Sequence, residues 1–337
     1  MTRTRGLRVI DRGGGMKTRL LRDIEVSEVG MGCMAFSHGY GQIPPEEYSV
    51  EAIRNAYRNG CTFFDTAEIY SPNLSGIGHN ERIVGKALYG VREQVVIATK
   101  LFLNGFEAVG RGSVYNAVRR HLEGSLTRLG TDRVDLYYLH RMGGVSVEKI
   151  AEAMGRLMED GLIRGWGLSQ VDVPVIQKAN RVTPLSAVQN IYSMVERDAE
   201  KGVIPYCLEN NIGFVPFSPI ASGLLSGKIT VDTQFERHDD VRNWVPQLSK
   251  ANIAGNQPII DLLKKYAEMK NATSAQISLA WMLHKYPNVV PIPGSKNKER
   301  IVENLDASKV ELTDEEFRSL EEALDGCRVY GHRGFHR

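Results

Sequence analysis

The sequence predicts a single (β/α)8 TIM barrel of the α/β class, because segments typical of strands and of helices alternate along it. Eight short apolar runs are each followed by a segment with apolar residues at helical spacing. The units recur roughly every 25–40 residues, which is typical of a parallel sheet with a helix after each strand. Eight such units close a sheet into a barrel. The length of 337 residues fits one large barrel or two average domains.

The expected strands and helices follow one another along most of the chain. The strands are expected at residues 29–32, 62–65, 95–100, 134–140, 165–169, 186–190, 213–218 and 289–294. The helices are expected at residues 45–59, 81–88, 113–129, 147–160, 173–181, 195–210, 259–269, 275–284, 298–305 and 313–324. Thr273 with Gln276, and Thr313 with Glu316, have the spacing of a capping box and predict two helix starts.

Three segments are expected to stand apart from these units. Residues 1–15 read as a disordered extension, which leaves residues 16–337 as the barrel domain. Residues 17–27 are typical of a short hairpin ahead of the core. The insertion at residues 226–256 is long and polar, and such loops are usually functional lids or disordered. We therefore expect long loops over the C-terminal face of the barrel.

Composition excludes several classes of function. The net charge of +2 gives no electrostatic reason to bind nucleic acid or an anionic membrane. No apolar run approaches the roughly 20 residues that span a bilayer, and the basic start lacks the apolar region of a secretory signal. Four cysteines are scattered without CxxC spacing, so we expect reduced thiols, a cytoplasmic location and no metal site.

Four chemically different side chains stand at or just past the ends of apolar runs. The run at residues 62–65 ends in Asp65 and is followed by Tyr70, the next ends in Lys100, and the third ends in His140. In a parallel sheet these ends face one common side, where catalytic groups converge. The pattern predicts that all four side chains share one active site.

The four groups make chemical sense together. An adjacent ammonium favours the phenolate, so we expect Lys100 to lower the pKa of Tyr70 from its usual value of about 10. Asp65 would keep Lys100 charged and in place. Tyr70 would then exchange a proton near neutral pH, and neutral His140 would orient a carbonyl group. None of these residues transfers a hydride, so a cofactor is expected.

With these residues in place, the chain resembles the aldo-keto reductase superfamily from residue 16 to the last helix. The motifs that carry the resemblance are Phe64-Asp65-Thr66-Ala67 with Tyr70, Ala98-Thr99-Lys100, Leu139-His140, Gly167-Leu168-Ser169, Val188-Gln189-Asn190 and Pro291-Ile292-Pro293-Gly294-Ser295. Arg141 and Gly78-His79-Asn80-Glu81 are similar to a bacterial branch near potassium-channel β-subunits and general-stress reductases. The resemblance implies NADPH-dependent reduction of aldehydes and ketones, with Tyr70 as general acid.

The resemblance also implies a site for NADPH or NADP+. Nicotinamide contacts are expected from Gly32, Cys33, Met34, Asp65, Ser169, Gln170 and Gln189, with Phe217 stacked on the ring. The pyrophosphate contacts would be Ser218, Pro219, Leu225, Gly227 and Lys228. The 2′-phosphate and adenine contacts would be Gly294, Ser295, Lys296, Arg300, Glu303 and Asn304. Cations at a helix N-terminus suit phosphate, which favours NADPH over NADH.

Gly30, Gly32 and Ala35 also fit the G-x-G-x-x-A dinucleotide fingerprint. That fingerprint needs a helix directly after it, and here a loop-like stretch follows at residues 36–41. A Rossmann fold is therefore not expected.

The substrate is less readable. By position Phe36, Phe102, Arg141 and Trp244 are expected to line its pocket, and Arg141 hints at a polar or anionic compound. Besides a small-molecule carbonyl substrate, a second copy of the chain is a possible partner, because the sequence leaves the oligomeric state open.

An alternative function is a nucleotide-sensing binding subunit with little turnover. Reduction of a carbon–carbon double bond is disfavoured, because it would call for a glutamate in place of His140.

Overall fold

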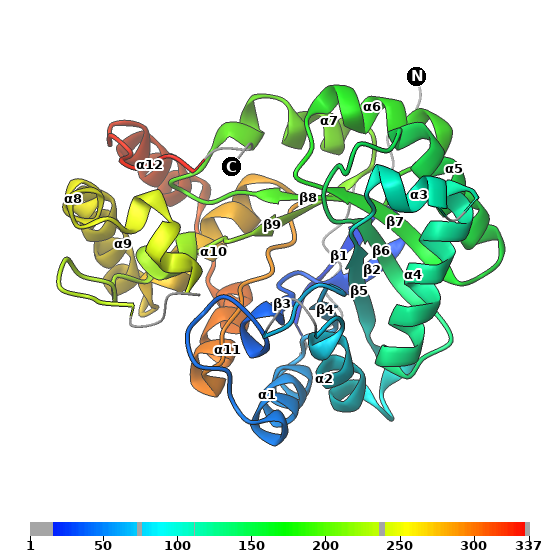
Figure 1. The fold of residues 1–337 in the computed structure, drawn as a ribbon. Helices are drawn as coiled ribbons and strands as arrows, with labels where there is room; N and C mark the ends of the chain where they lie inside the picture. Colours follow the sequence, from blue (N-terminus) through cyan, green and yellow to red (C-terminus); the bar gives the residue numbers. More distant parts are fainter. Residues whose placement is uncertain (1–15, 73–75, 111, 236–239, 334–337) are drawn as a thin grey trace.

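The computed structural model describes residues 16–72, 76–110, 112–235 and 240–333, and these residues form a single barrel domain (Figure 1). Seven parallel strands form its sheet, in the order β3 (Met31–Gly32), β4 (Phe63–Asp65), β5 (Val96–Leu101), β6 (Val134–Leu139), β7 (Ile163–Ser169), β8 (Ala187–Ile191) and β9 (Gly213–Phe217). Helices surround the sheet. The predicted fold is therefore confirmed, while the expected extension at 1–15 lies outside the described residues.

The helices are α1 (Glu46–Arg58), α2 (His79–Leu88), α3 (Gly105–Gly110), α4 (Val114–Leu129), α5 (Val147–Glu159), α6 (Val173–Val182), α7 (Val203–Glu209), α8 (Lys250–Gly255), α9 (Gln257–Lys270), α10 (Ser274–Lys285), α11 (Lys298–Leu305) and α12 (Asp314–Asp325). Both predicted capping boxes form, at Thr273 and at Thr313. The single helix expected at 195–210 was wrong, because a 3-10 turn and α7 meet at Gly202, which the helix cannot continue through. Helices α3 and α8 were not predicted.

The eighth expected strand, residues 289–294, closes the barrel without forming a regular ladder. Val290 and Ile292 donate their N–H groups to carbonyls of β9, at 2.9 and 3.2 Å. Proline has no N–H to donate, so Pro291 and Pro293 only accept, from Gly30 at 2.9 Å and Gly32 at 3.4 Å. The segment lies between β9 and β3 and completes the ring, although only one bridge, Phe214 to Val289, has ladder geometry.

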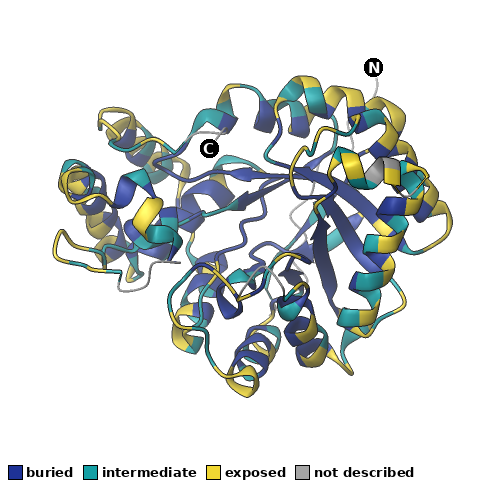
Figure 2. Ribbon diagram, in the orientation of Figure 1, coloured by how far each residue is buried: buried dark blue, intermediate teal, exposed yellow. Residues whose placement is uncertain are grey.

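The strands and the inner faces of the helices are buried, as Figure 2 shows, and their apolar side chains form two separate cores. The larger one lies between the sheet and the helices. The smaller one fills the barrel interior and includes Leu21, Ile24 and Val26 of the N-terminal hairpin, β1 (Thr18–Leu21) and β2 (Ile24–Ser27). The predicted hairpin therefore forms, and its apolar side chains fill the end of the barrel where the strands begin.

Arg19 fixes this hairpin to the outer layer. Its guanidinium is buried, pairs with Glu28 at 3.1 Å and donates to the carbonyls of Leu283, Tyr286 and Val289. These carbonyls stand at or just past the end of α10, where a helix leaves acceptors without partners. With this end closed, the opposite face is the one open to ligands. None of the described helices has the length and apolar character to cross a bilayer.

Candidate active site

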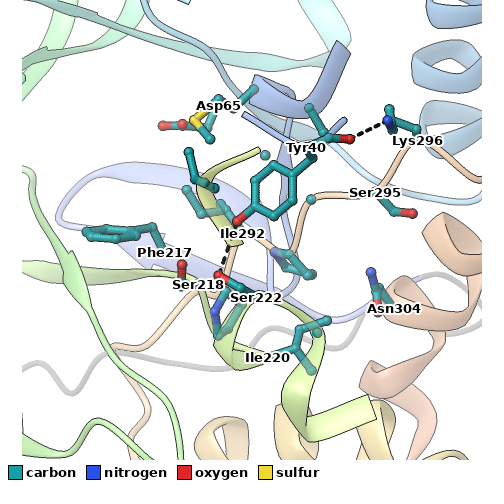
Figure 3. Close-up of a pocket in the computed structure, with 18 of the residues that line it drawn as sticks. Tyr40, Asp65, Phe217, Ser218, Ile220, Ser222, Ile292, Ser295, Lys296 and Asn304 are labelled. Atoms are coloured by element: carbon teal, nitrogen blue, oxygen red, sulfur yellow. Dashed lines mark hydrogen bonds between the residues drawn. The ribbon is translucent and has the colours of Figure 1, made fainter. Parts of the chain in front are cut away.

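A cavity of about 580 Å³ opens at the C-terminal ends of the strands, within the range of small-molecule sites. Five strand ends contribute Gly32, Asp65, Ser169, Gln189 and Phe217 to its wall. Figure 3 shows Asp65 and Phe217 toward one end of the cavity and Ser295, Lys296 and Asn304 toward the other. The cavity is therefore elongated, with different chemistry at its two ends.

The alternation of side chains along the strands explains why the predicted catalytic residues lie at the cavity. Alternate side chains of a strand face the barrel interior, so an inward row that begins in the core ends in the cavity. On β5, Ala98 belongs to the inner core and Lys100 follows two residues later. On β6, Tyr138 belongs to the same core and precedes His140 in the same way. Asp65 completes the set at the end of β4.

Lys100 connects the other members of the group. Its ammonium forms an ion pair with Asp65, donates to the carbonyl of Thr66 at 2.7 Å and lies 3.5 Å from the Tyr70 hydroxyl. Lys100 is fully buried behind the wall, whereas Asp65 and Tyr70 line the cavity. The tetrad expected from the sequence therefore comes together at one point.

The environment of Tyr70 differs from the expectation in one respect. Burial raises the pKa of the Tyr70 hydroxyl, and the nearby Lys100 ammonium only partly offsets that effect. The expected net lowering was wrong for the protein without ligands, because desolvation outweighs a single cation. Tyr70 is therefore held in its protonated form and is ready to act as an acid.

Lys100 and His140 have opposite protonation states. Burial lowers the pKa of Lys100, but attraction to Asp65 and Tyr70 outweighs it and raises the net pKa, so the ammonium stays charged. Burial lowers the pKa of His140 well below its usual value, and the charges of Lys100 and Arg141 lower it further. The His140 imidazole is therefore neutral. Its ring packs edge-on against Tyr70, with centroids 5.7 Å apart.

One nitrogen of His140, Nδ1, is buried and has no hydrogen-bond partner among the described residues. A buried N–H without an acceptor is costly, so we assign the ring hydrogen to Nε2. That assignment leaves Nε2 as the hydrogen-bond donor of the ring, and His140 lines the cavity together with Tyr70.

The wall next to the tetrad carries polar and aromatic residues from neighbouring strands. Gln189 donates to Asp65 at 2.8 Å, so its amide is held in a fixed orientation. Gly32 and Gly294 approach closely at the base: a Cβ on Gly32 would lie 2.9 Å from the carbonyl oxygen of Ile292. A side chain at this point would force the two backbone segments apart.

The far end of the cavity is rich in cations. Among the described residues that line the whole cavity are six Lys or Arg side chains and two carboxylates, namely Arg141, Lys228, Arg242, Lys296, Arg300 and Arg333 against Asp65 and Glu303. Arg141, Arg333 and Asp65 belong to the tetrad end, and the other four cations lie with Glu303 farther away. Lys296 donates to the carbonyl of Tyr40, as Figure 3 shows, and also to the carbonyl of Gln42. Arg300 stands in the first turn of α11, whose N-cap is Asn297. Cations at a helix N-terminus form a site suited to phosphate.

The loop after β9 has unusual backbone geometry. Ser218, Ala221 and Ser222 have φ angles of 51, 47 and 55°, in the left-handed region that non-glycine residues rarely adopt, and Gly223 follows at 101°. Such conformations cost free energy and cluster at ligand sites. The loop contributes Ser218, Pro219 and Ser222 to the cavity wall.

Most of the residues predicted for cofactor binding line the cavity, but not all. Those that do are Gly32, Met34, Asp65, Ser169, Gln189, Phe217, Ser218, Pro219, Lys228, Gly294, Ser295, Lys296, Arg300, Glu303 and Asn304. Those outside the lining are Cys33, Gln170, Leu225 and Gly227. Cys33 and Leu225 are buried in the outer core, and the Gln170 side chain accepts from the N–H of Ile191 at 3.1 Å.

Of the four residues predicted to contact substrate, the structure brings only Arg141 into the cavity wall. Phe36 is fully buried in the outer core, and Phe102 is 39% exposed and outside the lining. Trp244 is 78% exposed and lies outside the lining, whereas its neighbours Val241 and Arg242 belong to it. The path of an irregular loop decides such placements, and no periodicity predicts it.

Several lining residues were missed by sequence reasoning. Val241 donates to the carbonyl of Gly39 at 2.8 Å, and the Arg242 guanidinium lies 5.6 Å from the Tyr40 ring centroid. These contacts join two distant loops over the cavity. Arg333, four residues from the end of the chain, also lines it. Only a long-range contact carries these residues to the site, so no local signal reveals them.

The comparisons with known proteins identify the family. A model of the aldo/keto reductase family matches residues 28–325. The chain belongs to the aldo/keto reductase family. It is 35% identical over 325 residues to a Schizosaccharomyces pombe protein named aldo-keto reductase yakc, NADP(+), with 94% of each chain covered. The resemblance expected from the motifs is therefore confirmed.

Solved structures of this family are also similar. The glycerol dehydrogenase of Gluconobacter oxydans superposes with a TM-score of 0.79 at 27% identity, over 95% of both chains. An aldo/keto reductase from Klebsiella pneumoniae, in complex with NADP and acetate, has a TM-score of 0.69 at 28% identity. This match covers 90% of the present chain and 93% of the other. The aldo/keto reductase barrel therefore extends over nearly the whole chain.

Proposed function

We propose that the protein is an NADP(H)-dependent oxidoreductase that reduces aldehydes or ketones to alcohols. The observation that carries this proposal is the Lys100 ammonium 3.5 Å from a protonated, cavity-facing Tyr70 hydroxyl, with neutral His140 beside it. This arrangement delivers a proton at one point and a hydrogen-bond donor next to it. A carbonyl oxygen that becomes an alkoxide needs both.

The cavity fits a phosphorylated dinucleotide. Its length, the glycine base at Gly32 and Gly294, and the excess of cations away from the tetrad suit a ligand that is polar at one end and anionic at the other. The fixed amide of Gln189 and the ring of Phe217 would hold the nicotinamide. Ser295, Lys296 and Arg300 would hold the 2′-phosphate. A similar family member is complexed with NADP, which supports this choice.

The residues of the chain handle the proton. NADPH, when bound, supplies the hydride that the protein lacks. The Tyr70 hydroxyl donates its proton to the carbonyl oxygen as negative charge develops there. Lys100 stabilises the phenolate that remains, and Asp65 holds Lys100 in position. His140 donates from Nε2 to the same oxygen and fixes its direction. In the reverse direction the Tyr70 phenolate accepts the alcohol proton.

The test is a screen for NADPH consumption with the whole chain, over aliphatic and aromatic aldehydes and ketones, with NADH as the control cofactor. We expect turnover of several compounds and a preference for NADPH. NADPH binding is measured in parallel by fluorescence. Tight binding without turnover across the panel would refute a reductase and favour the nucleotide-sensing alternative.

A further inference from the structure

Two arginines stand close to the tetrad without an acidic partner. Arg141 follows His140 directly and donates from Nη1 to the His140 carbonyl at 3.0 Å and to the Ser169 hydroxyl at 3.3 Å. Arg333 donates from Nη1 to the Ser218 hydroxyl at 3.3 Å. Both line the cavity, and within the described ranges no carboxylate forms an ion pair with either guanidinium.

Two other cations of the same cavity are paired with carboxylates. Arg242 forms an ion pair with Asp240 at 2.6 Å, and Lys228 approaches Glu303 at 3.3 Å. Charged groups that are partly removed from water usually have such partners. Arg141 and Arg333 contact only neutral oxygens, so their positive charges are not compensated.

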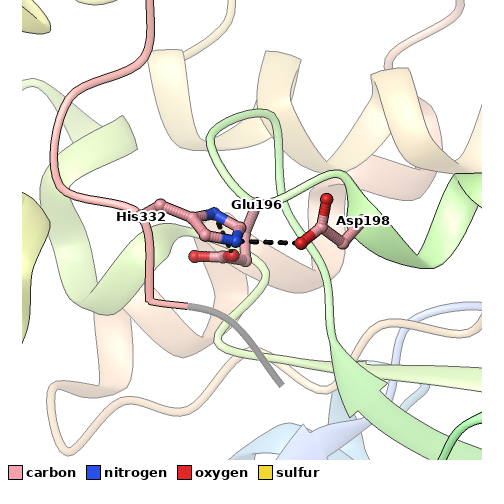
Figure 4. Close-up of side chains that lie close together, drawn as sticks. All are labelled: Glu196, Asp198 and His332. Atoms are coloured by element: carbon pink, nitrogen blue, oxygen red, sulfur yellow. Dashed lines mark ion pairs between the residues drawn. The ribbon is translucent and has the colours of Figure 1, made fainter. Parts of the chain in front are cut away.

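The position of Arg333 is built by the fold. The preceding residue, His332, contacts Glu196 at 2.7 Å and Asp198 at 2.9 Å, as Figure 4 shows. The backbone N–H of Arg333 donates to Glu196 at 2.8 Å, and Glu196 is buried. Gln247 donates to the same carboxylate at 2.9 Å. The C-terminal segment is therefore anchored beside the cavity, and Arg333 is the side chain that it places there.

The two guanidiniums also affect each other. Burial lowers the pKa of Arg141, Tyr70 opposes that effect, and the positive charge of Arg333 lowers the pKa again. Like charges placed together near a low-dielectric site are unfavourable unless an anion compensates them. A guanidinium binds a planar oxyanion through two parallel N–H groups, which makes arginine the residue suited to carboxylate or phosphate.

We propose that Arg141 and Arg333 together bind an oxyanion of the substrate, so that the preferred carbonyl compounds carry a carboxylate or phosphate group close to the carbonyl. This inference rests on the proposed reductase function and names its substrate class. The carbonyl oxygen lies at Tyr70 and His140, and the charged end of the same molecule lies at the arginine pair. Neutral aldehydes have no oxyanion, so the arginine pair does not strengthen their binding.

The kinetic experiment uses matched substrates. With NADPH, kcat/KM is measured for 4-carboxybenzaldehyde against benzaldehyde, for 4-oxobutanoate against butanal, and for glyceraldehyde 3-phosphate against glyceraldehyde. We expect the wild type to prefer the charged member of at least one type of pair. In Arg333→Met the charged-to-neutral ratio falls by about ten- to a hundredfold, as expected for a lost charge-assisted hydrogen bond. Arg333→Lys keeps the positive charge but loses the two parallel N–H donors of the guanidinium. Its charged-to-neutral ratio should lie between those of the wild type and Arg333→Met.

The control variant is Arg318→Met, the same chemical change on the exposed surface of α12, outside the cavity lining. It should keep the wild-type ratio. A second readout does not need turnover: calorimetry of 4-(hydroxymethyl)benzoate and of benzyl alcohol with the protein–NADP+ complex. The benzoate should bind more tightly to the wild type, and Arg333→Met should remove most of that difference.

The outcomes separate the two proposals. If no aldehyde is reduced, the reductase proposal fails and calorimetry alone decides the arginine pair. If aldehydes are reduced but charged and neutral members are equivalent in the wild type and in Arg333→Met, the inference is wrong and the reductase stands. If Arg333→Met instead weakens NADPH binding and leaves the ratio unchanged, Arg333 serves the nucleotide phosphates and the inference is also wrong.

Discussion

The tetrad and the rim of the cavity are built in different ways. Asp65, Lys100 and His140 project from strand ends, are at most 8% exposed, and are joined by contacts from several strands. The rim consists of loops and the C-terminal segment, and two of its arginines, Arg141 and Arg333, contact neutral oxygens only among the described residues. The barrel strands fix the position of the tetrad, whereas the position of the rim residues depends on the path of irregular loops.

This difference separates chemistry from selectivity. A proton donor must keep its geometry within a fraction of an ångström. Tyr70 itself lies in the turn after β4, and the strand residue Lys100 is the group that it contacts. A specificity surface tolerates change, because loops accept substitutions and insertions that strands do not. We therefore expect substitutions in the tetrad to lower the stability of the fold and the turnover of every substrate. Substitutions at the rim should change which ligand is preferred.

The largest effect is expected from Tyr70→Phe. The change removes one hydroxyl and keeps the ring that packs against His140, so turnover should fall by about 10²- to 10⁴-fold for all substrates. NADPH binding, measured by fluorescence, should persist. Turnover at the wild-type level would show that Tyr70 is not the acid.

Lys100→Met should destabilise the fold as well as reduce turnover. It leaves the buried Asp65 carboxylate without its cation, which typically costs about 3–5 kcal/mol. Urea unfolding measures this loss. The double variant Lys100→Met with Asp65→Asn should recover most of the stability and none of the activity. Equal stability of the single and double variants would contradict a coupled pair.

His140 should make stability depend on pH. Its folded pKa lies well below the unfolded value of about 6.5, so below that pH only the unfolded chain binds the proton. Stability should then fall as the pH decreases from about 6.5, by up to about 1.4 kcal/mol per pH unit. His140→Gln should lack this component, so unfolding free energies of the two proteins should converge in acid. Parallel pH curves would place the titration elsewhere.

At the rim, Arg300→Ala should raise the KM for NADPH by about tenfold, because one charge-assisted contact to the 2′-phosphate is lost. The KM for NADH, which has no such phosphate, should change little. Both constants are measured with one saturating aldehyde. An equal effect on the two cofactors would argue that Arg300 does not read the 2′-phosphate.

The smallest effect is expected from Trp244→Ala. The side chain is 78% exposed and outside the cavity lining, so kcat/KM should stay at the wild-type level for small aldehydes. A loss of about tenfold in kcat/KM would mean that the loop moves over the cavity when ligands bind. Trp244 would then belong to the site itself.

The sequence predicts the first region well for a physical reason. Asp65, Lys100 and His140 end strands whose apolar period is local, and parallel strand ends must meet on one side. It predicts the second region poorly. Arg333 reaches the cavity because its neighbour His332 contacts Glu196 and Asp198, more than a hundred positions away, and Trp244 lies in an irregular loop and is exposed. The pKa direction of Tyr70 also needed coordinates, since it depends on the depth of burial.

The segment at 289–294 has a further consequence. Between it and β3 the backbone bonds seen in the described chain are those donated by Gly30 and Gly32, since two prolines offer no hydrogen in return. Few backbone hydrogen bonds join this seam, and Ser295 and Lys296, which are proposed to hold the 2′-phosphate, follow it directly. A dinucleotide that contacts residues on both sides of this seam would stabilise the closed barrel, and a closed barrel would in turn bind the dinucleotide more tightly.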